Sequence, residues 1–180
     1  MSSFSNPLRN AVGAADAYVG ALLDVLGDQD PLDVLLRTPA RLRDAVEGVP
    51  EAALRRPEAP GKWSVVAVVQ HLADSELGYG YRIRLTVGQD RPAIPGYDQD
   101  AWAERLRYEA VRPEDALADF EALRTMNLRF LRALPDAAWA RAGLHSERGE
   151  ESVRRLTRLM AGHDLVHLHQ VDRIKAAVAG

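Results

Sequence analysis

Apolar residues recur at intervals of three and four along the last part of the chain, from Ser152 to Val178. The series consists of Val153, Leu156, Met160, Val171, Ile174 and Val178. His163 and His167 fill the gap in this series in register, so the pattern predicts one helix whose inward face carries two imidazoles. Two histidines four residues apart project from adjacent turns, which suits coordination of a single ion. His169 lies off the stripe and is expected to face solvent.

A third histidine lies on another predicted helix, which begins after Ser64, a natural N-cap, and runs to about Gln89. The face that carries this histidine collects small or polar residues: Val68, His71, Ser75, Gly78 and Arg82. Such a face is typical either of the wall of an internal cavity or of a solvated helix edge. The histidine pair favours the cavity, because His71, His163 and His167 together supply three nitrogens. Three protein ligands leave one coordination position for water or substrate, as in catalytic zinc sites.

Three further segments have helical periodicity and recognisable ends. They run from Leu8 to Gly27, from Pro31 to Gly48 and from Pro113 to Pro135. Pro39 is expected to mark a kink or a boundary. No segment has a convincing strand pattern, and the stretch from Trp139 to Glu151 is expected to be a loop. Four amphipathic helices with inward polar groups predict an all-α fold, a four-helix bundle with a site in its core and an additional N-terminal helix.

A chain of 180 residues fits one domain with a sizeable core. Within it, residues 1–30 are expected to form an N-terminal helical extension, and residues 31–180 the bundle. The extension is either peripheral or the contact surface of a homodimer. A long connector, Arg91 to Arg112, contains a short helical piece around Asp100 to Tyr108. Connectors this long are usually functional, so this one either covers the mouth of the cavity or straps the bundle.

Charge and composition exclude several classes of function. The net charge is -3 without a basic tract, so nucleic acid is not expected as a partner. The chain has no cysteine, which excludes disulfides and thiolate ligands, and any thiol chemistry must use a thiol brought by a substrate. No signal peptide or membrane span is recognisable, and we expect a cytoplasmic protein that does not associate with a membrane.

Two familiar metal-site patterns do not fit the histidines. His163 and His167 with Asp164 between them imitate a zinc-protease motif, but aspartate is one methylene shorter than the glutamate base of that motif. A di-iron carboxylate bundle needs glutamate three residues before each histidine, and Val68 and Met160 occupy those positions. A mononuclear divalent site remains, and imidazole ligands suit nickel, zinc or similar ions.

Several motifs, taken together in this order and spacing, resemble the DinB/YfiT-like superfamily. They are Gly61-Lys62-Trp63-Ser64, His71-Leu72-Ala73-Asp74-Ser75-Glu76, Pro95-Gly96-Tyr97 with Trp102, His145-Ser146-Glu147-Arg148-Gly149, and His163 with His167. The resemblance covers residue 32 to the end. It implies a four-helix bundle that binds one divalent ion, commonly nickel or zinc, through histidines that match His71, His163 and His167. Close YfiT-like sequences carry extra histidines where this chain has Val166 and Gln170.

The resemblance implies a metal-dependent transferase that joins a low-molecular-weight thiol, such as bacillithiol, to an electrophilic substrate. The alternatives are a metal-dependent hydrolase and a non-catalytic, stress-related metal-binding bundle. A divalent ion with an open position lowers the pKa of a thiol or water, which makes a nucleophile without a cysteine or serine. We expect Arg82 to hold a carboxylate of the thiol, Asp164 to orient a ligand imidazole, and His145 to act as a proton shuttle or to be an exposed bystander.

Overall fold

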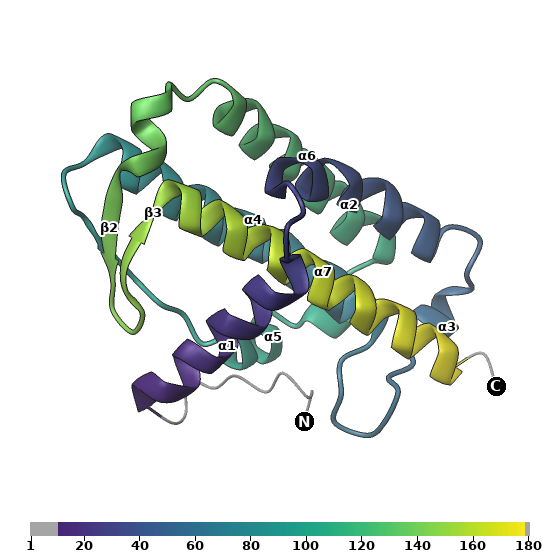
Figure 1. Cartoon of the computed structure of the whole chain (residues 1–180). Coiled ribbons are helices and arrows are strands. Elements are labelled where there is room, and N and C mark those ends of the chain that lie inside the picture. The colour runs from purple at the N-terminus through teal and green to yellow at the C-terminus, as the bar shows by residue number, and fades with distance from the viewer. Residues whose placement is uncertain (1–10, 179–180) are drawn as a thin grey trace.

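The computed structural model describes residues 11–178, and these form a helical bundle with a small sheet at one side (Figure 1). The helices are α1 (Ala11–Leu26), α2 (Pro31–Val46), α3 (Glu51–Leu54), α4 (Val65–Gly88), α5 (Gln99–Arg105), α6 (Pro113–Arg132) and α7 (Val153–Val178). Two 3₁₀ turns, η2 (Tyr108–Ala110) and η3 (Asp136–Ala140), flank α6, and the strands are β1 (Ala93–Ile94), β2 (Ala142–His145) and β3 (Gly149–Ser152). Helices α2, α4, α6 and α7 are the four long helices of the expected bundle, which confirms the fold class.

Capping residues set the helix starts as the sequence predicts. The side chain of Asp30 accepts a hydrogen bond from the backbone N–H of Asp33 and begins α2, and Ser64 does the same for α4 through Ala67. Pro39 lies inside α2, which continues to Val46, so the expected helix boundary at this proline is wrong.

The apolar stripe of α7 faces the bundle as predicted. Seven of its eight positions are buried, and only the last, Val178, is partly exposed. His169 lies on the exposed side of the helix, as expected. The apolar core along α7 consists of two clusters: Leu156 and Met160 pack with residues of α1, α2 and α4, and Val171 and Ile174 pack with residues of α2, α4 and α6.

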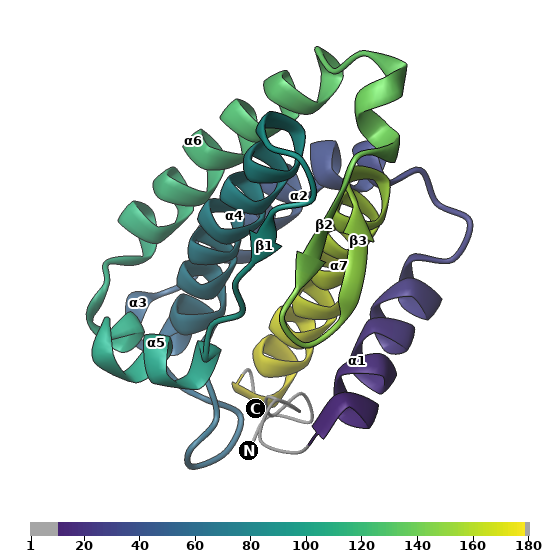
Figure 2. The ribbon, with the colours of Figure 1, turned by 90° about the vertical axis from the view of Figure 1, so that its left-hand side faces the viewer.

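Helix α1 lies against α7 in both views (Figures 1 and 2). Its residues Val19, Leu22 and Leu26 are buried in the core. At Gly162 the two helices approach so closely that a Cβ atom would lie 2.2 Å from the carbonyl oxygen of Leu22, and only glycine allows this contact. The predicted helix start at Leu8 lies outside the described residues, and a homodimer through α1 stays a prediction.

The expectation of no strand is wrong, because the described residues contain a three-stranded sheet (Figure 2). Strand β1 pairs in parallel with β2, where Ile94 is opposite His145, and β2 pairs with β3 as an antiparallel hairpin. The stretch predicted as a loop before α7 is this hairpin. Strands of two to four residues are too short for an alternating pattern, and the pairing of β1 with β2 joins segments about fifty residues apart.

Within the described residues, no helix is long and apolar enough to cross a membrane.

Candidate metal centre

Three imidazoles from two helices meet in the core of the bundle. His71 projects from α4, and His163 and His167 project from adjacent turns of α7. The Nε2 atom of His163 lies 3.0 Å from that of His71 and 3.1 Å from that of His167. All three side chains are 5% exposed or less. The structure therefore brings together the three residues that the sequence predicts as ligands.

The spacing of these nitrogens fits a divalent ion. Zn–N bonds of about 2.0–2.1 Å in a tetrahedral site put neighbouring ligand nitrogens roughly 3.3 Å apart. Without a cation the group is poorly satisfied, because the Nε2 atom of His163 carries at most one proton to share between two neighbouring nitrogens. The Nδ1 atom of His71 also has no hydrogen-bond partner. Among the described residues, His71, His163 and His167 are the group with metal-ligand geometry.

Burial keeps the three imidazoles neutral. It lowers the pKa of His71 and of His163 well below 6.5, and the nearby histidines lower both pKa values further. Burial also lowers the pKa of His167 to about 4, although Gln170 and Asp164 act in the opposite direction. At pH 7 each ring thus keeps a lone pair, which is the form that binds a metal.

Gln170 orients the third imidazole. Its Oε1 atom accepts a hydrogen bond of 2.8 Å from Nδ1–H of His167, and both side chains are buried. Because the proton is held on Nδ1, the lone pair of Nε2 points to the other two histidines. From the sequence alone, Gln170 stands out only as a departure from related sequences. Its position three residues after His167 on a helix was the signal that could have identified it.

Asp164 does not orient a ligand imidazole, so that expectation is wrong. Its Oδ1 and Oδ2 atoms lie 3.0 and 2.7 Å from the guanidinium of Arg124, which is 1% exposed. Asp164 follows His163 directly and therefore projects about 100° around the helix, toward α6 instead of the triad.

Arg124 joins four helices behind the triad. It donates hydrogen bonds to Glu76 of α4, Asp164 of α7 and the carbonyl oxygen of Leu35 in α2. Asn127, one turn further along α6, donates to both the backbone and the side chain of Glu76. The network fixes α4 and α7, the two helices that carry the triad. Sequence reasoning missed it, because a charged residue on an amphipathic helix is normally on its solvated face.

The inward face of α4 is buried, which excludes the solvated-edge interpretation. Ser75 Oγ lies 3.5 Å from Nε2 of His71 and 3.3 Å from the hydroxyl of Tyr97 in the connector. Arg82 is buried, and its Nε and Nη2 atoms donate to the carbonyl oxygen of Pro95. The connector is thus held against α4 beside the triad.

His145 is neither exposed nor in a loop, so the expectation that it is an exposed bystander is wrong. It ends β2 and is buried, with Nδ1 accepting a hydrogen bond from the backbone N–H of Glu147. Burial and the nearby charge of Arg148 lower its pKa to about 4.

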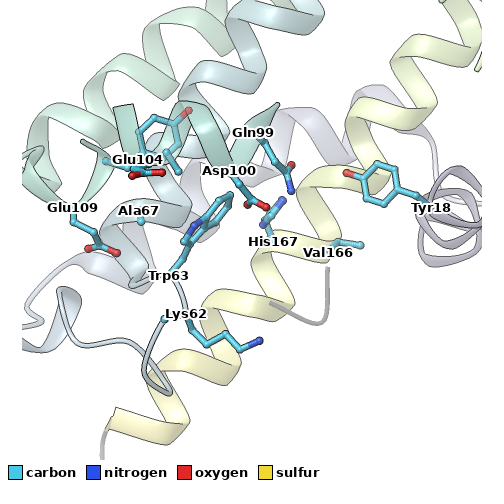
Figure 3. Close-up of a pocket in the computed structure, with 13 residues that line it drawn as sticks. Tyr18, Lys62, Trp63, Ala67, Gln99, Asp100, Glu104, Glu109, Val166 and His167 are labelled. Carbon is cyan, nitrogen blue, oxygen red and sulfur yellow. The ribbon is translucent and has the colours of Figure 1, made fainter. Parts of the chain in front are cut away.

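A cavity of about 420 Å³ reaches the triad at His167 (Figure 3). Trp63 and Tyr108 form part of its wall, and Asp100 and Glu104 come from α5 in the connector. Asp100 and Glu104 are exposed, so the cavity opens at the molecular surface. The ring of Trp63 lies 4.9 Å from that of His71, between centroids. Residues of the connector thus line this cavity, whereas the only residue of α4 in its lining is Ala67, so the predicted cavity wall along Ser75 and Arg82 is not part of it.

A helical bundle in which three buried imidazoles from two helices surround one point has the architecture of a mononuclear metal protein. The family model of the DinB superfamily matches residues 35–171 of this chain. The chain therefore belongs to the DinB superfamily.

Individual relatives agree with this assignment. "Putative metal-dependent hydrolase YfiT" of Bacillus subtilis is 32% identical over 79% of this chain and 82% of its own length. The solved structure of Bacillus subtilis YfiT, reported with an unusual four-helix bundle topology, has a TM-score of 0.71 at 30% identity and covers 79% of this chain and 84% of its own. A "Putative metal-dependent hydrolase" of Bacillus licheniformis is 29% identical over 98% of this chain and 92% of its own length, and this similarity includes α1.

Proposed function

We propose that this protein is a metal-dependent transferase that joins a small thiol, such as bacillithiol, to an electrophilic substrate. The observation that carries the proposal is the convergence of three neutral, buried Nε2 atoms at the end of a cavity open to the surface. His71, His163 and His167 would hold one nickel or zinc ion. When bound there, a divalent ion with an open position supplies a Lewis acid that lowers the pKa of a thiol or a water.

The residues around the triad suit a thiol better than water. A free thiol has a pKa near 8.5, so it ionises near neutral pH with little assistance. Attack by water usually needs a general base within hydrogen-bond reach. Among the described residues, the polar groups hydrogen-bonded to the triad are Ser75 and Gln170, and neither is a base. Asp164, the nearest carboxylate in sequence, is bound to Arg124.

In the proposed reaction the chain binds, orients and shields the reactants. The thiol proton leaves to solvent, the sulfur forms a bond to the electrophilic carbon, and the leaving group departs with the electron pair of the broken bond. Gln170 keeps the His167 lone pair directed at the centre, and Trp63 covers one side of the triad. Because the chain has no cysteine, the thiol must come from the substrate.

A hydrolase is the second candidate. The names of the relatives support it, and the cavity that His167 lines also carries Asp100, a carboxylate that a water-activating reaction would use (Figure 3). In that reaction the same three histidines hold the ion, and water replaces the thiol.

One assay separates the candidates. Protein loaded with nickel or zinc is offered bacillithiol, or a simple thiol, with 1-chloro-2,4-dinitrobenzene, and in parallel an activated ester without thiol. If the protein is a transferase, the metal-loaded form should release chloride and form the thioether. The His163→Ala variant should lose both activities, and the His169→Ala variant should keep them. Ester hydrolysis with no thioether formation favours the hydrolase. A fully loaded protein that is inert in both assays favours a non-catalytic bundle.

A further inference from the structure

Arg82 is a buried cation that has no carboxylate partner among the side chains that the structure describes. It is 6% exposed, and its hydrogen-bond acceptor is the backbone oxygen of Pro95. Two other arginines with little exposure are neutralised: Arg124 by Glu76 and Asp164, and Arg148 by Glu151. Within residues 16–178, no carboxylate oxygen lies within 4.0 Å of the Arg82 guanidinium. Buried charges in proteins are normally paired, so the Arg82 guanidinium lacks the anionic partner that burial usually requires.

His145 offers a second unused donor close by. It is 4% exposed, and its Nδ1 atom accepts the backbone N–H of Glu147 at 3.2 Å. In the neutral ring the proton therefore sits on Nε2. This Nε2 atom is buried and has no hydrogen-bond partner in the described structure. Buried donors without a partner are rare in folded proteins and indicate a missing ligand or water.

The two donors belong to one cluster between the triad and the hairpin. Arg82 donates to the carbonyl oxygen of Pro95, and Pro95 directly follows Ile94, the residue opposite His145 in the sheet. The Arg82 guanidinium carbon lies 5.8 Å from the ring centroid of Tyr79, and that ring lies 6.2 Å from the ring of His163. An anion held by Arg82 is thus one aromatic ring away from the candidate metal centre. Figure 2 shows β1 and the hairpin on this side of α4 and α7.

We propose that Arg82 and His145 form a carboxylate-binding site, and that the substrate of this protein carries a carboxylate in addition to its reacting group. The guanidinium would pair with the carboxylate, and the Nε2–H group of His145 would donate a hydrogen bond to it. Arg148 is neutralised by Glu151, so one uncompensated charge remains, which matches a monoanion better than a phosphate dianion. The assignment of this carboxylate to the substrate rests on the proposed function, whereas the anion site itself does not.

The anion site is tested by NMR on ¹⁵N-labelled protein, with hexanoate and 1-hexanol as matched probes. Hexanoate is expected to shift the side-chain Nε–Hε signal of Arg82 and the ring signals of His145, with at least tenfold tighter binding than hexanol. Arg82→Gln should remove the preference for the carboxylate, and His145→Gln should reduce it several-fold. Arg105→Gln, which changes an exposed arginine of α5, should leave it intact.

Equal affinity for hexanoate and hexanol in the unmodified protein overturns the proposal, whether or not Arg82→Gln folds. A carboxylate preference that survives in folded Arg82→Gln overturns it as well. Both titrations are run on metal-free and zinc-loaded protein, and bound zinc is measured by elemental analysis. If the protein does not bind zinc but still prefers hexanoate, the result contradicts the proposed metal-dependent function and leaves the proposed carboxylate site standing.

The link to the substrate is tested with 6-mercaptohexanoate on zinc-loaded protein. A molecule that reaches both the triad and Arg82 should bind at least tenfold more tightly than either hexanoate or 6-mercaptohexanol. Affinity no better than that of hexanoate, in protein shown to bind 6-mercaptohexanol, would mean that the carboxylate site does not serve a thiol substrate.

Discussion

Gln170 holds the imidazole of His167 through a hydrogen bond of 2.8 Å, made entirely within the buried core. The contact fixes which ring nitrogen carries the proton, and with it the nitrogen that remains free to bind a metal. In the described structure, the Nδ1 atoms of His71 and His163 have no such bond. Gln170 is the only side chain outside the triad that is hydrogen-bonded to an Nδ1 atom of the three histidines.

Removing this contact should weaken metal binding without unfolding the protein. We expect Gln170→Leu to lower zinc affinity by about 10- to 100-fold, the range typical for partners of ligand histidines. Gln170→Glu, which keeps an acceptor at the same position, should retain most of the affinity. Competition with a chromophoric chelator measures both. Equal affinity of Gln170→Leu and the unmodified protein would show that the hydrogen bond has no part in binding.

The ligand set itself predicts a stoichiometric site. One nickel or zinc ion per chain should remain bound after gel filtration of untagged protein, as measured by elemental analysis. His163→Ala should lower affinity by orders of magnitude, because His163 lies between the other two nitrogens. His169→Ala serves as the matched control, since that histidine is exposed on the same helix. Unchanged metal content in His163→Ala would exclude the site.

Metal should stabilise a bundle that already exists without it. The ligands come from helices distant in sequence, so the unfolded chain binds the ion poorly, and zinc at a hundred times Kd should add about 2.7 kcal/mol. Circular dichroism should show the metal-free protein fully helical, with a melting temperature that rises with zinc concentration. Complete unfolding by a chelator would instead indicate a structural ion.

Arg124 should be essential for stability. Its removal leaves Glu76 and Asp164 as uncompensated buried carboxylates, so we expect Arg124→Met to cost about 3–5 kcal/mol in urea unfolding. Adding Glu76→Gln and Asp164→Asn should recover part of this loss, because the charges that lost their partner are then gone. A triple variant as unstable as the single one would show that packing, and not charge, is the main contribution.

Acid should destabilise the metal-free protein within a defined window. Burial lowers the pKa of His145 and of His167 to about 4, whereas the unfolded chain keeps values near 6.5. Between these pH values the unfolded chain takes up protons that the folded chain does not. The free energy of unfolding should therefore fall from pH 6.5 toward pH 4, by up to about 1.4 kcal/mol per pH unit for each histidine.

Unfolding by urea at several pH values measures this slope. His145→Gln should reduce it by about one proton, and the exposed His169→Gln should leave it unchanged. An identical slope in His145→Gln would show that this imidazole does not remain neutral in the folded protein.

The periodic features of the sequence predicted the frame and the triad. The α7 stripe and the Ser64 cap depend on local spacing, so the sequence alone places all three histidines on inward faces of helices. What escaped prediction depends on contacts between distant segments. From its position in the sequence, Arg124 is expected at the surface, and only the folded structure brings Glu76 and Asp164 to it. Strands β1 and β2 are too short to show an alternation of apolar and polar residues.

Through its contact with Gly162, α1 supports the helix that carries two of the candidate metal ligands. Gly162 directly precedes His163, and the backbone of Leu22 rests on it, so the helix that carries two of the triad histidines is supported from behind by residues 11–26. Cutting the chain at Pro31, the expected start of the bundle, would remove Val19, Leu22 and Leu26 and expose the apolar residues of α7 that pack with them. A shortened protein of this kind would aggregate or rearrange. Its failure to bind metal would therefore reveal nothing about the histidines.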